Sequence, residues 1–500
     1  MLKKFRIRSS KKRFLFRFIV GLATTAILLN QLWLTTPVKA ETQAYCQLSE
    51  KAIAEKERLH SEALKGNSDD QNRYKDILKQ HAAMLQKCRS ETWPNEQAIW
   101  LRLYPCDILP GSIERTLDHI VNRGYNKVYL ETFFDGQVLL PQDDNPTPWS
   151  SVVRSPGTEN VDLLAQAIEK GHERGLKVYA WLFSMNFGYA YSQLSDRQDV
   201  LARNGKGQDS TMFVSDGSQT FIDPYNRQAK IDYYNLIQTV AKRKPDGMLF
   251  DYIRYPRGTG TESVASNVKD LWIYSNASRE ALYQRASNRK GLALIERFVD
   301  RGYITVGDIK TVDELYPDED VPRWQGRTPS PTEIDDPLPV RQDKLQQDLW
   351  YLAVAHAAQG VLDFLTFAKT VAERQGIPAG AVFFSDSNIA VGITGFDSRL
   401  QPWDRFPRSL EWHPMSYAVC GNTGCVVDQV RRVASGAPVG TEVIPAIAGL
   451  WGKSYDNRPS LEDQMQAIRQ AVPQVNAVSH FAYSWQEPER DKARRFCQIE

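Results

Sequence analysis

The chain has 500 residues, 42% of them hydrophobic and 24% charged, which is enough to form one large domain or two to three ordinary ones. The formal net charge is +2, but residues 1–40 contain nine basic and no acidic side chains, so the rest has 53 basic and 60 acidic residues and a net charge of −7. A mildly acidic surface argues against nucleic acid as the partner, because nucleic acid binds to a basic face.

Residues 1–40 have the pattern of an export signal. Eight Lys or Arg residues lie between Lys3 and Arg17, an apolar run follows over 18–34, and Val38-Lys39-Ala40 supplies the small residues that a signal peptidase prefers. The apolar run is near the length that spans a bilayer, so an uncleaved membrane anchor is the alternative. We expect export to the periplasm or the extracellular space, with membrane contact only if this segment is retained.

Residues 41–92 are predicted to form a helical hairpin in front of the main domain. Between 47 and 89 the chain is charged, carries Ala and Leu, and is interrupted once at Gly66-Asn67-Ser68-Asp69, as expected for two antiparallel helices. We assign no catalysis to this hairpin, because such helices usually only pack or tether.

The six cysteines fit an exported protein, because disulfides persist in oxidising compartments. Six cysteines allow fifteen pairings, and the sequence does not choose among them. Two pairs could close locally and would leave a third: Cys46 with Cys88, Cys420 with Cys425, and Cys106 with Cys497. The spacings lack a paired Cys-x-x-Cys pattern, so we expect no structural zinc, and no other metal or cofactor is predicted.

From residue 93 to residue 500 the chain has short apolar runs separated by helical stretches. The eight runs cover 98–103, 127–133, 176–183, 247–253, 381–385, 411–417, 443–448 and 478–485, and amphipathic helices are predicted over 112–123, 161–174, 227–242 and 461–471. Eight strand–helix repeats predict an α/β fold, a (β/α)₈ TIM barrel of parallel strands with right-handed crossovers. An open doubly wound sheet is the alternative, but no Gly-x-Gly-x-x-Gly follows an early strand.

One connection in this barrel is unusually long. About 125 residues separate the fourth and fifth runs, which predicts a large insertion after strand 4, an inserted helical subdomain over about 257–379, with a helix over 343–375. The loop over 186–224 is also long. Both follow strands, so they are expected on the C-terminal face, where they could wall or cover a site. Beyond the N-terminal segment, we expect no stretch that is apolar enough to span a bilayer.

The segment Asp246-Gly-Met-Leu-Phe-Asp-Tyr-Ile-Arg-Tyr-Pro256 carries the best catalytic candidate. A buried strand follows the turn at 245–247, and Pro256 prevents the strand from continuing. Asp251 is therefore expected at the C-terminal end of the fourth strand, where barrel enzymes assemble their active sites. The alternative is a structural ion pair between Asp251 and Arg254.

Other strand ends supply partners for Asp251. Two carboxyls can cleave a glycoside, one protonating the leaving oxygen and the other attacking carbon or activating water. Asp386 is the preferred general acid, because the fourth and fifth strands are adjacent, and Glu131 and Glu487 are the other candidates. A separation of roughly 5–5.5 Å would imply retention of configuration, and roughly 6.5–9.5 Å inversion.

Aromatic and polar side chains cluster near the same strand ends. Flat rings with polar edges suit the C–H faces of sugars. The predicted substrate-binding residues are Arg254, Tyr255, Tyr252, Trp181, Asn186, His413, Tyr417, Trp451 and Trp485. Neither a Gly-x-Ser-x-Gly elbow nor a His-Glu-x-x-His site is present, which argues against a serine hydrolase and a zinc protease.

Four segments together resemble the glycosyl-hydrolase-like family 10. The segment over 246–256 and Phe221-Ile-Asp-Pro224 look like its signature, and Leu176-Lys-Val-Tyr-Ala-Trp181 and His413-Pro-Met-Ser-Tyr417 are similar to its third and sixth strands. The resemblance implies an envelope or extracellular barrel that hydrolyses O-glycosidic bonds of cell-wall glycan or another polysaccharide. The family often has two consecutive acids where this chain has Asp251-Tyr252. Its Asp-Pro at a helix start matches Asp223-Pro224, where Asp as N-cap implies a structural role.

We therefore expect a secreted, monomeric glycoside hydrolase that acts on a polysaccharide or a peptidoglycan-type glycan. Asp251 would be nucleophile or base, Arg254 would orient it and keep it ionised, and a second carboxyl would be the acid. The alternative is a non-catalytic glycan-binding envelope protein on the same barrel. A third possibility is a scaffold that acts through the N-terminal hairpin.

Overall fold

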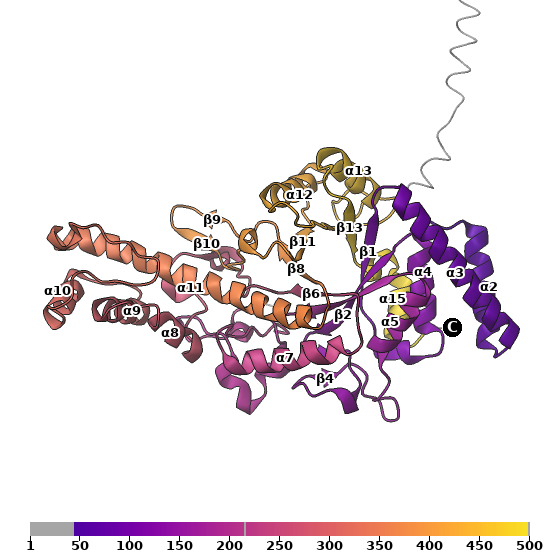
Figure 1. The fold of residues 1–500 in the computed structure, drawn as a ribbon, viewed down its shortest axis with the longest axis horizontal. Coiled ribbons are helices and arrows are strands. Elements are labelled where there is room, and N and C mark those ends of the chain that lie inside the picture. The colour runs from indigo at the N-terminus through magenta and orange to yellow at the C-terminus, as the bar shows by residue number, and fades with distance from the viewer. Residues whose placement is uncertain (1–44, 215–216, 499–500) are drawn as a thin grey trace, which may run out of the picture.

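Eight parallel strands close into a barrel in the computed structural model, which describes residues 45–214 and 217–498 (Figure 1). The strands are β1 (Glu96–Leu101), β2 (Lys127–Phe134), β5 (Lys177–Phe183), β6 (Gly247–Asp251), β8 (Ala379–Phe384), β11 (Glu411–Ser416), β12 (Ala446–Ala448) and β13 (Ala477–Phe481). Each pairs with the next in this order, and β1 pairs with both β2 and β13, which closes the ring. The predicted TIM barrel and all eight strands are confirmed. The export signal over 1–40 lies outside the described residues.

Helices cover the outside of this ring. They are α4 (Ser112–Asn122), α5 (Leu163–Glu173), α7 (Arg227–Ala241), the second half of α11 (Leu338–Arg374), α12 (Gly424–Gly436), α13 (Leu461–Ala471) and, after β13, α14 (Tyr483–Gln486) and α15 (Pro488–Arg495). Each of the four predicted amphipathic helices is present, because its apolar stripe packs against the strands. Between β8 and β11 the chain instead forms the short strands β9 (Ala390–Val391) and β10 (Gly395–Asp397) and a 3₁₀ turn.

Inward-facing side chains of the strands fill the barrel with aromatic rings. The Trp100 ring contacts those of Tyr129 and Trp181, each at a centroid distance of 4.7 Å. Glycine makes room for such rings, since a Cβ on Gly247 would lie 2.3 Å from the Tyr179 ring. The alternation of large and small residues makes this interior a packed core, so a substrate is expected at the strand ends and not within the ring.

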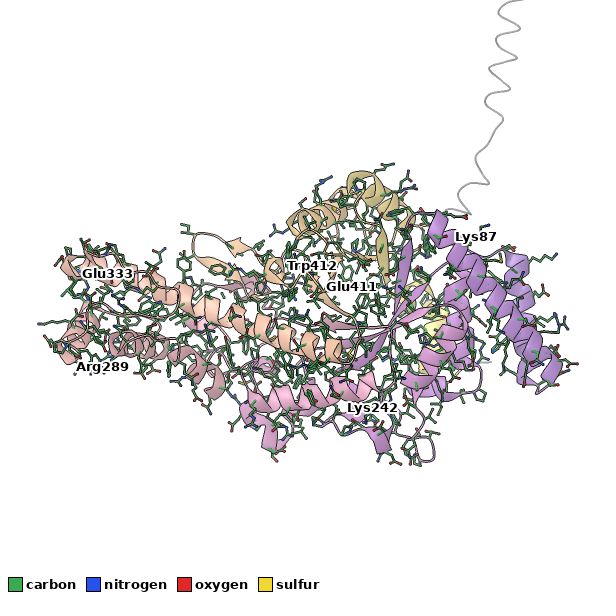
Figure 2. All side chains as sticks on the ribbon, viewed as in Figure 1. Lys87, Lys242, Arg289, Glu333, Glu411 and Trp412 are labelled. Atoms are coloured by element: carbon green, nitrogen blue, oxygen red, sulfur yellow. A yellow bond between two sulfur atoms is a disulfide. The ribbon has the colours of Figure 1, made fainter. Side chains whose placement is uncertain are left out.

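An arm extends from the barrel beyond the C-terminal ends of the strands, at the left in Figure 1. It consists of α8 (Asn276–Tyr283), α9 (Arg289–Arg301), α10 (Val306–Leu315) and the first half of α11. Figure 2 labels Arg289 and Glu333 in it, and Glu333 forms a buried ion pair with Arg327 at 2.6 Å. The second half of α11 packs on α7, β6 and β8. The segment 257–379 therefore contains the fourth barrel helix besides the inserted arm.

Two expectations for this part of the chain are wrong. By length and composition α11 could cross a membrane, although we expected no such stretch; more than half of its most apolar 18-residue window is buried within the protein. The N-cap of α7 is Asn226 and not Asp223. The Asp223 carboxylate instead accepts hydrogen bonds from the Ser275 hydroxyl at 2.7 Å and the Ser278 N–H at 2.9 Å, which tie the start of α8 to the barrel.

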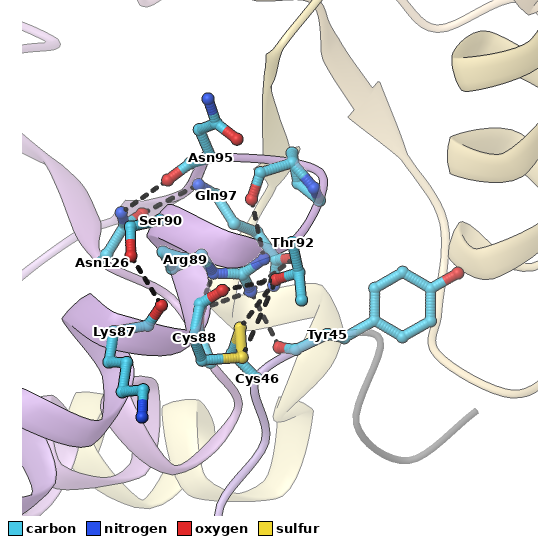
Figure 3. The surroundings of a disulfide bond; sticks show 12 residues. Tyr45, Cys46, Lys87, Cys88, Arg89, Ser90, Thr92, Asn95, Gln97 and Asn126 are labelled. Carbon is cyan, nitrogen blue, oxygen red and sulfur yellow. Dashed lines mark hydrogen bonds between the residues drawn. A yellow bond between two sulfur atoms is a disulfide. The ribbon is translucent and has the colours of Figure 1, made fainter. Parts of the chain in front are cut away.

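The helices α2 (Glu50–Leu64) and α3 (Ser68–Glu91) form a hairpin at the other end of the molecule (Figure 1). The disulfide Cys46–Cys88 closes its base, and Cys106–Cys497 and Cys420–Cys425 are also formed, which is one of the fifteen pairings that the sequence left open. Figure 3 shows the buried Arg89 guanidinium beside the first disulfide. It donates to the carbonyls of Tyr45, Pro94 and Gly124 and so joins the hairpin to the barrel.

A buried ionic cluster adds a second attachment of the hairpin. The Asp118 carboxylate of α4 accepts from the Arg174 guanidinium at 2.9 Å and from the Tyr74 hydroxyl of α3, and it lies 3.6 Å from the Lys56 ammonium of α2. All four side chains are buried. Burial lowers the pKa of Lys56 to about 8, against the attraction of Asp118. Asp118 is therefore an ion-pair partner of two buried cations, of which Arg174 also pairs with Glu173 at 3.6 Å.

We predict that Asp118→Asn destabilises the protein by about 3–5 kcal/mol, because it leaves the buried Lys56 ammonium without its ion-pair partner and leaves Arg174 only Glu173, at 3.6 Å. Urea unfolding measures the change. The matched control is Asp428→Asn, which removes an exposed ion pair with Arg431 and should change stability by about 0.5 kcal/mol or less. Equal effects of the two substitutions would contradict a role of the cluster in holding the hairpin.

Candidate active site

Asp251 lies at the C-terminal end of β6, as predicted, and its side chain points into the barrel mouth. Only 6% of the residue is exposed. Its Oδ2 accepts a hydrogen bond from the Trp181 indole at 3.1 Å, and its Oδ1 accepts from the Tyr252 N–H at 2.6 Å. Trp181 can reach it because β5 and β6 are neighbours in register, with Phe183 opposite Asp251. Two donors from adjacent elements thus fix the carboxylate.

Arg254 does not orient Asp251, contrary to our expectation. The Arg254 guanidinium donates to the Tyr255 carbonyl at 3.0 Å and lies over the rings of Phe221, Tyr252 and Phe384. Its positive charge still helps to lower the pKa of Asp251 from a distance. Arg254 therefore favours the ionised form of Asp251, as expected, but acts through a longer-range electrostatic effect and not through a direct contact.

Tyr252 follows Asp251 in a left-handed backbone conformation, with φ 52°. This region is unfavourable for a residue with a bulky side chain, and such strain is concentrated at functional sites. The conformation places the Tyr252 ring 4.3 Å from the Phe183 ring, measured between centroids. The strand end therefore presents a carboxylate and a phenol side by side.

Glu131 of β2 is the second carboxyl at the barrel mouth, and 3% of it is exposed. It is paired in register with Trp181, the residue that donates to Asp251. The Arg102 guanidinium, which follows β1, donates to both carboxylate oxygens of Glu131. A β-bulge between Glu131 and Phe133 shifts the register here, and bulges of this kind re-aim side chains near active sites.

A tight turn after β2 brings a third carboxyl to the same place. Asp135 and Gly136 have φ of 47° and 72°, and they connect β2 to the antiparallel strand β3 (Gln137–Val138) in a two-residue hairpin. The Asp135 Oδ2 lies 3.7 Å from the Arg102 guanidinium. Arg102 therefore holds two carboxylates, of which Asp135 is the more exposed.

Both buried carboxyls have raised pKa values. Burial raises the pKa of Asp251 to about 6, although the Tyr252 N–H, Arg254 and Trp181 all favour the charged form. Burial also raises the pKa of Glu131 to about 7, against the pull of Arg102, and the charges of Asp135 and Asp251 add to the rise. Two acids that titrate near neutral pH at the ends of barrel strands are suited to proton transfer.

The two other acid candidates pair with residues other than Asp251. Asp386 follows β8, its side chain is 53% exposed, and it pairs with Arg399 at 3.0 Å. Glu487 lies outside the barrel, where its Oε1 is 3.3 Å from Arg123 and 3.4 Å from His119 of α4. The geometry therefore favours Glu131 over Asp386 and Glu487 as the partner of Asp251.

Apart from Arg254, the eight other predicted binding residues divide into two groups. Trp181, Tyr252, Tyr417 and Trp485 are at the mouth: the charge of Asp251 acts on the Tyr417 hydroxyl, and the rings of Tyr417 and Trp485 both contact Phe481. Four residues are placed elsewhere, which corrects our expectation. Asn186, Tyr255 and His413 are fully buried, and the Trp451 indole donates to the Tyr125 hydroxyl outside the barrel.

Sequence reasoning missed Arg102 and Phe481. Arg102 is two residues after the inward-facing Trp100, and this period of two was the available signal. Phe481 lies within the last predicted strand, but an apolar residue in a barrel strand gives no indication of function.

A cavity of about 400 Å³ lies elsewhere, between α11 and the connection over 387–405, and Asp251 is not among its lining residues. Within the described ranges, no cluster of His, Cys, Asp or Glu suits a metal ion.

Comparison with known proteins finds a family match over part of the chain. Residues 110–290 match the family Glycosyl hydrolase-like 10. This segment includes Glu131, Trp181 and Asp251, and the resemblance seen in the sequence is confirmed over it. Glycosyl hydrolase DigH of Escherichia coli K12 is 26% identical over 170 residues, which cover 32% of this chain. The chain thus matches only 36% of the length of that relative.

Solved structures of glycoside hydrolases are also similar to the chain. The PgaB (BpsB) glycoside hydrolase domain of Bordetella bronchiseptica is 14% identical, with a TM-score of 0.45 over 80% of this chain and 98% of that one. A GH20 exo-β-N-acetylglucosaminidase of Vibrio harveyi is 9% identical, with a TM-score of 0.40 over 81% of this chain and 52% of that one.

We predict that Asp251→Asn stabilises the protein at neutral pH. A carboxyl whose folded pKa is raised stabilises the fold when protonated, and this stability is lost as the pH rises from about 4 to about 6. The Asn variant has no such loss, so its advantage should grow over this window to about 2 kcal/mol. Urea unfolding at pH 4 and pH 7.5 measures it. A constant difference across the window would contradict the raised pKa.

Proposed function

We propose that this chain is an exported glycoside hydrolase that cleaves O-glycosidic bonds of a polysaccharide or cell-wall glycan. One observation carries the proposal: Asp251 and Glu131 are two buried carboxyls at the ends of β6 and β2, the two strands that flank β5, with pKa values raised to about 6 and about 7. Paired carboxyls with raised pKa values supply the acid and the nucleophile or base that this reaction needs.

The two carboxyls would have different roles. Glu131 has the higher pKa and is the general acid that protonates the leaving oxygen. The Arg102 guanidinium then stabilises the carboxylate that remains after proton transfer. Asp251 has the lower pKa and is the nucleophile or the base, held in place by Trp181 and the Tyr252 N–H. This assignment replaces Asp386 by Glu131.

The surroundings of the carboxyls support a sugar substrate outside the cytoplasm. Partly exposed rings at the mouth suit the C–H faces of sugars. Three disulfides suit an oxidising compartment, so a periplasmic or extracellular location is part of the proposal. The match of residues 110–290 to a glycosyl hydrolase-like family supports the reaction class. We propose a monomer that binds glycan directly.

A non-catalytic glycan-binding protein is the second candidate. One observation favours it: both oxygens of Glu131 accept hydrogen bonds from Arg102, which occupies the groups that an acid would use. Such a protein would bind the same polysaccharides through the aromatic mouth without cleaving them. Binding without release of reducing ends would identify it.

We predict that Asp251→Asn abolishes hydrolysis and that Glu131→Gln lowers kcat by about 10²–10⁴-fold, the usual contribution of a general acid. Reducing-end release from purified peptidoglycan and a panel of polysaccharides measures both. Asp386→Asn is the control, because Asp386 is exposed and paired with Arg399, and it should retain activity. Full activity of Asp251→Asn would exclude the proposed mechanism, and loss of activity in Asp386→Asn would restore Asp386 as the acid.

We also predict that Trp181→Phe shifts the acidic limb of the pH–rate profile to higher pH. The indole donates to the charged form of Asp251, so its loss should raise the pKa of that carboxyl above about 6 while the aromatic ring is kept. The pH dependence of kcat/KM against the most active polysaccharide tests this. A lower rate with an unshifted limb would show that Trp181 acts only by packing.

A further inference from the structure

A series of aromatic rings leads outward from Asp251. The Trp181 ring, whose indole donates to Asp251, lies 6.4 Å from the Phe481 ring, measured between centroids. Phe481 lies 5.9 Å from Trp485, and Trp485 lies 6.0 Å from Tyr455. Exposure increases along the series, from the buried Trp181 to Tyr455, which is 49% exposed. Each step is comparable to the length of one sugar residue.

Tyr455 is held in a defined position although it is exposed. It pairs with Arg458 across a two-residue turn, in which Asp456 and Asn457 have φ of 47° and 55°. The Arg458 guanidinium lies over the Trp485 ring and donates to the Tyr417 carbonyl at 3.3 Å. The turn that carries Tyr455 is therefore attached to the end of β11 and to the preceding ring of the series.

A disulfide-closed loop supports the same turn from the other side. Cys420 and Cys425 close residues 420–425 after β11. Within this loop the Gly421 N–H donates to the Asn457 carbonyl at 2.9 Å, and a Cβ on Gly421 would lie 3.1 Å from the Asn457 side chain. Closing so short a loop does little for global stability, since the gain grows with loop length. The local effect of the disulfide is to hold Gly421 in the position from which it supports the Tyr455 turn.

We propose that Tyr455 forms a distal sugar-binding position, supported by the Cys420–Cys425 loop, and that the substrate is therefore a glycan chain of several residues and not a short glycoside. This inference rests on the proposed function for the placement of the reacting bond at Asp251. The rings of Phe481 and Trp485 bind the intervening sugars, and Tyr455 stacks on a sugar several residues away from the reacting bond. Nothing in the reaction chemistry requires Tyr455, so its contribution is to affinity and to chain-length preference.

The test is binding of oligomers of increasing length by the full chain that carries Asp251→Asn. Isothermal titration with β-1,4-linked oligomers of N-acetylglucosamine and of glucose, each from two to six residues, gives affinity against length. We expect affinity to rise with length in one ladder. Adding Tyr455→Ala should lower the affinity for the longest oligomers about three- to tenfold and leave that for dimers unchanged, as expected for the loss of one stacking contact.

Two controls separate ring stacking from a general surface effect. Tyr455→Phe keeps the ring and should bind as the parent does. Tyr303→Ala removes a tyrosine that is 54% exposed on the arm and should change nothing. The double variant Cys420→Ser/Cys425→Ser should reproduce the length-dependent loss of Tyr455→Ala without changing the far-UV circular dichroism.

The outcomes distinguish this inference from the proposed function. Affinity that is independent of length in both ladders, or a length dependence that Tyr455→Ala does not reduce, overturns the inference, even if the wild type hydrolyses polysaccharide. A length dependence that Tyr455→Ala removes supports the inference, even if no polysaccharide is cleaved. In that case the distal position belongs to a glycan-binding protein.

Discussion

The hydrogen bond between the Trp181 indole and the Asp251 carboxylate is the interaction on which the site depends. It requires that β5 and β6 are parallel neighbours and that both residues point inward, and it therefore ties the chemistry to the pairing of these two strands. The same indole is paired in register with Glu131 and contacts the rings of Trp100 and Phe481. Residues of β1, β2, β6 and β13 are thus all neighbours of Trp181 on β5.

Burial of charge has opposite consequences in two parts of the molecule. At the mouth, burial raises the pKa values of Asp251 and Glu131, and the fold is less stable at neutral pH than it would be with neutral side chains. At the hairpin, Asp118 is surrounded by donors and cations and holds three helices together. At the mouth the effect of burial outweighs that of the nearby donors and cations, so the carboxyls can exchange protons near neutral pH, whereas at the hairpin the paired charges fix an attachment.

The eight strands could be predicted because apolar runs alternate with amphipathic helices. Asp251 could be placed at a strand end because Pro256 and the turn at 245–247 bracket the run. The preference of the geometry for Glu131 over Asp386 could not be predicted. It depends on a bulge in β2, on Arg102 and on the end of β8 at Phe384, after which the alternation of inward and outward side chains no longer applies. Tyr255 and Trp451 were misplaced for the same reason, because they follow strand ends.

The disulfide Cys106–Cys497 has a consequence for the whole chain. It links a residue shortly after the first strand to the C-terminal segment after the last, so the polypeptide forms a covalent ring that contains seven of the eight barrel strands completely. In the chain-entropy account, a closure over 391 positions restricts the unfolded chain by on the order of 5 kcal/mol. A protease cut in an exposed connection, such as the arm, would leave both fragments covalently joined around the barrel.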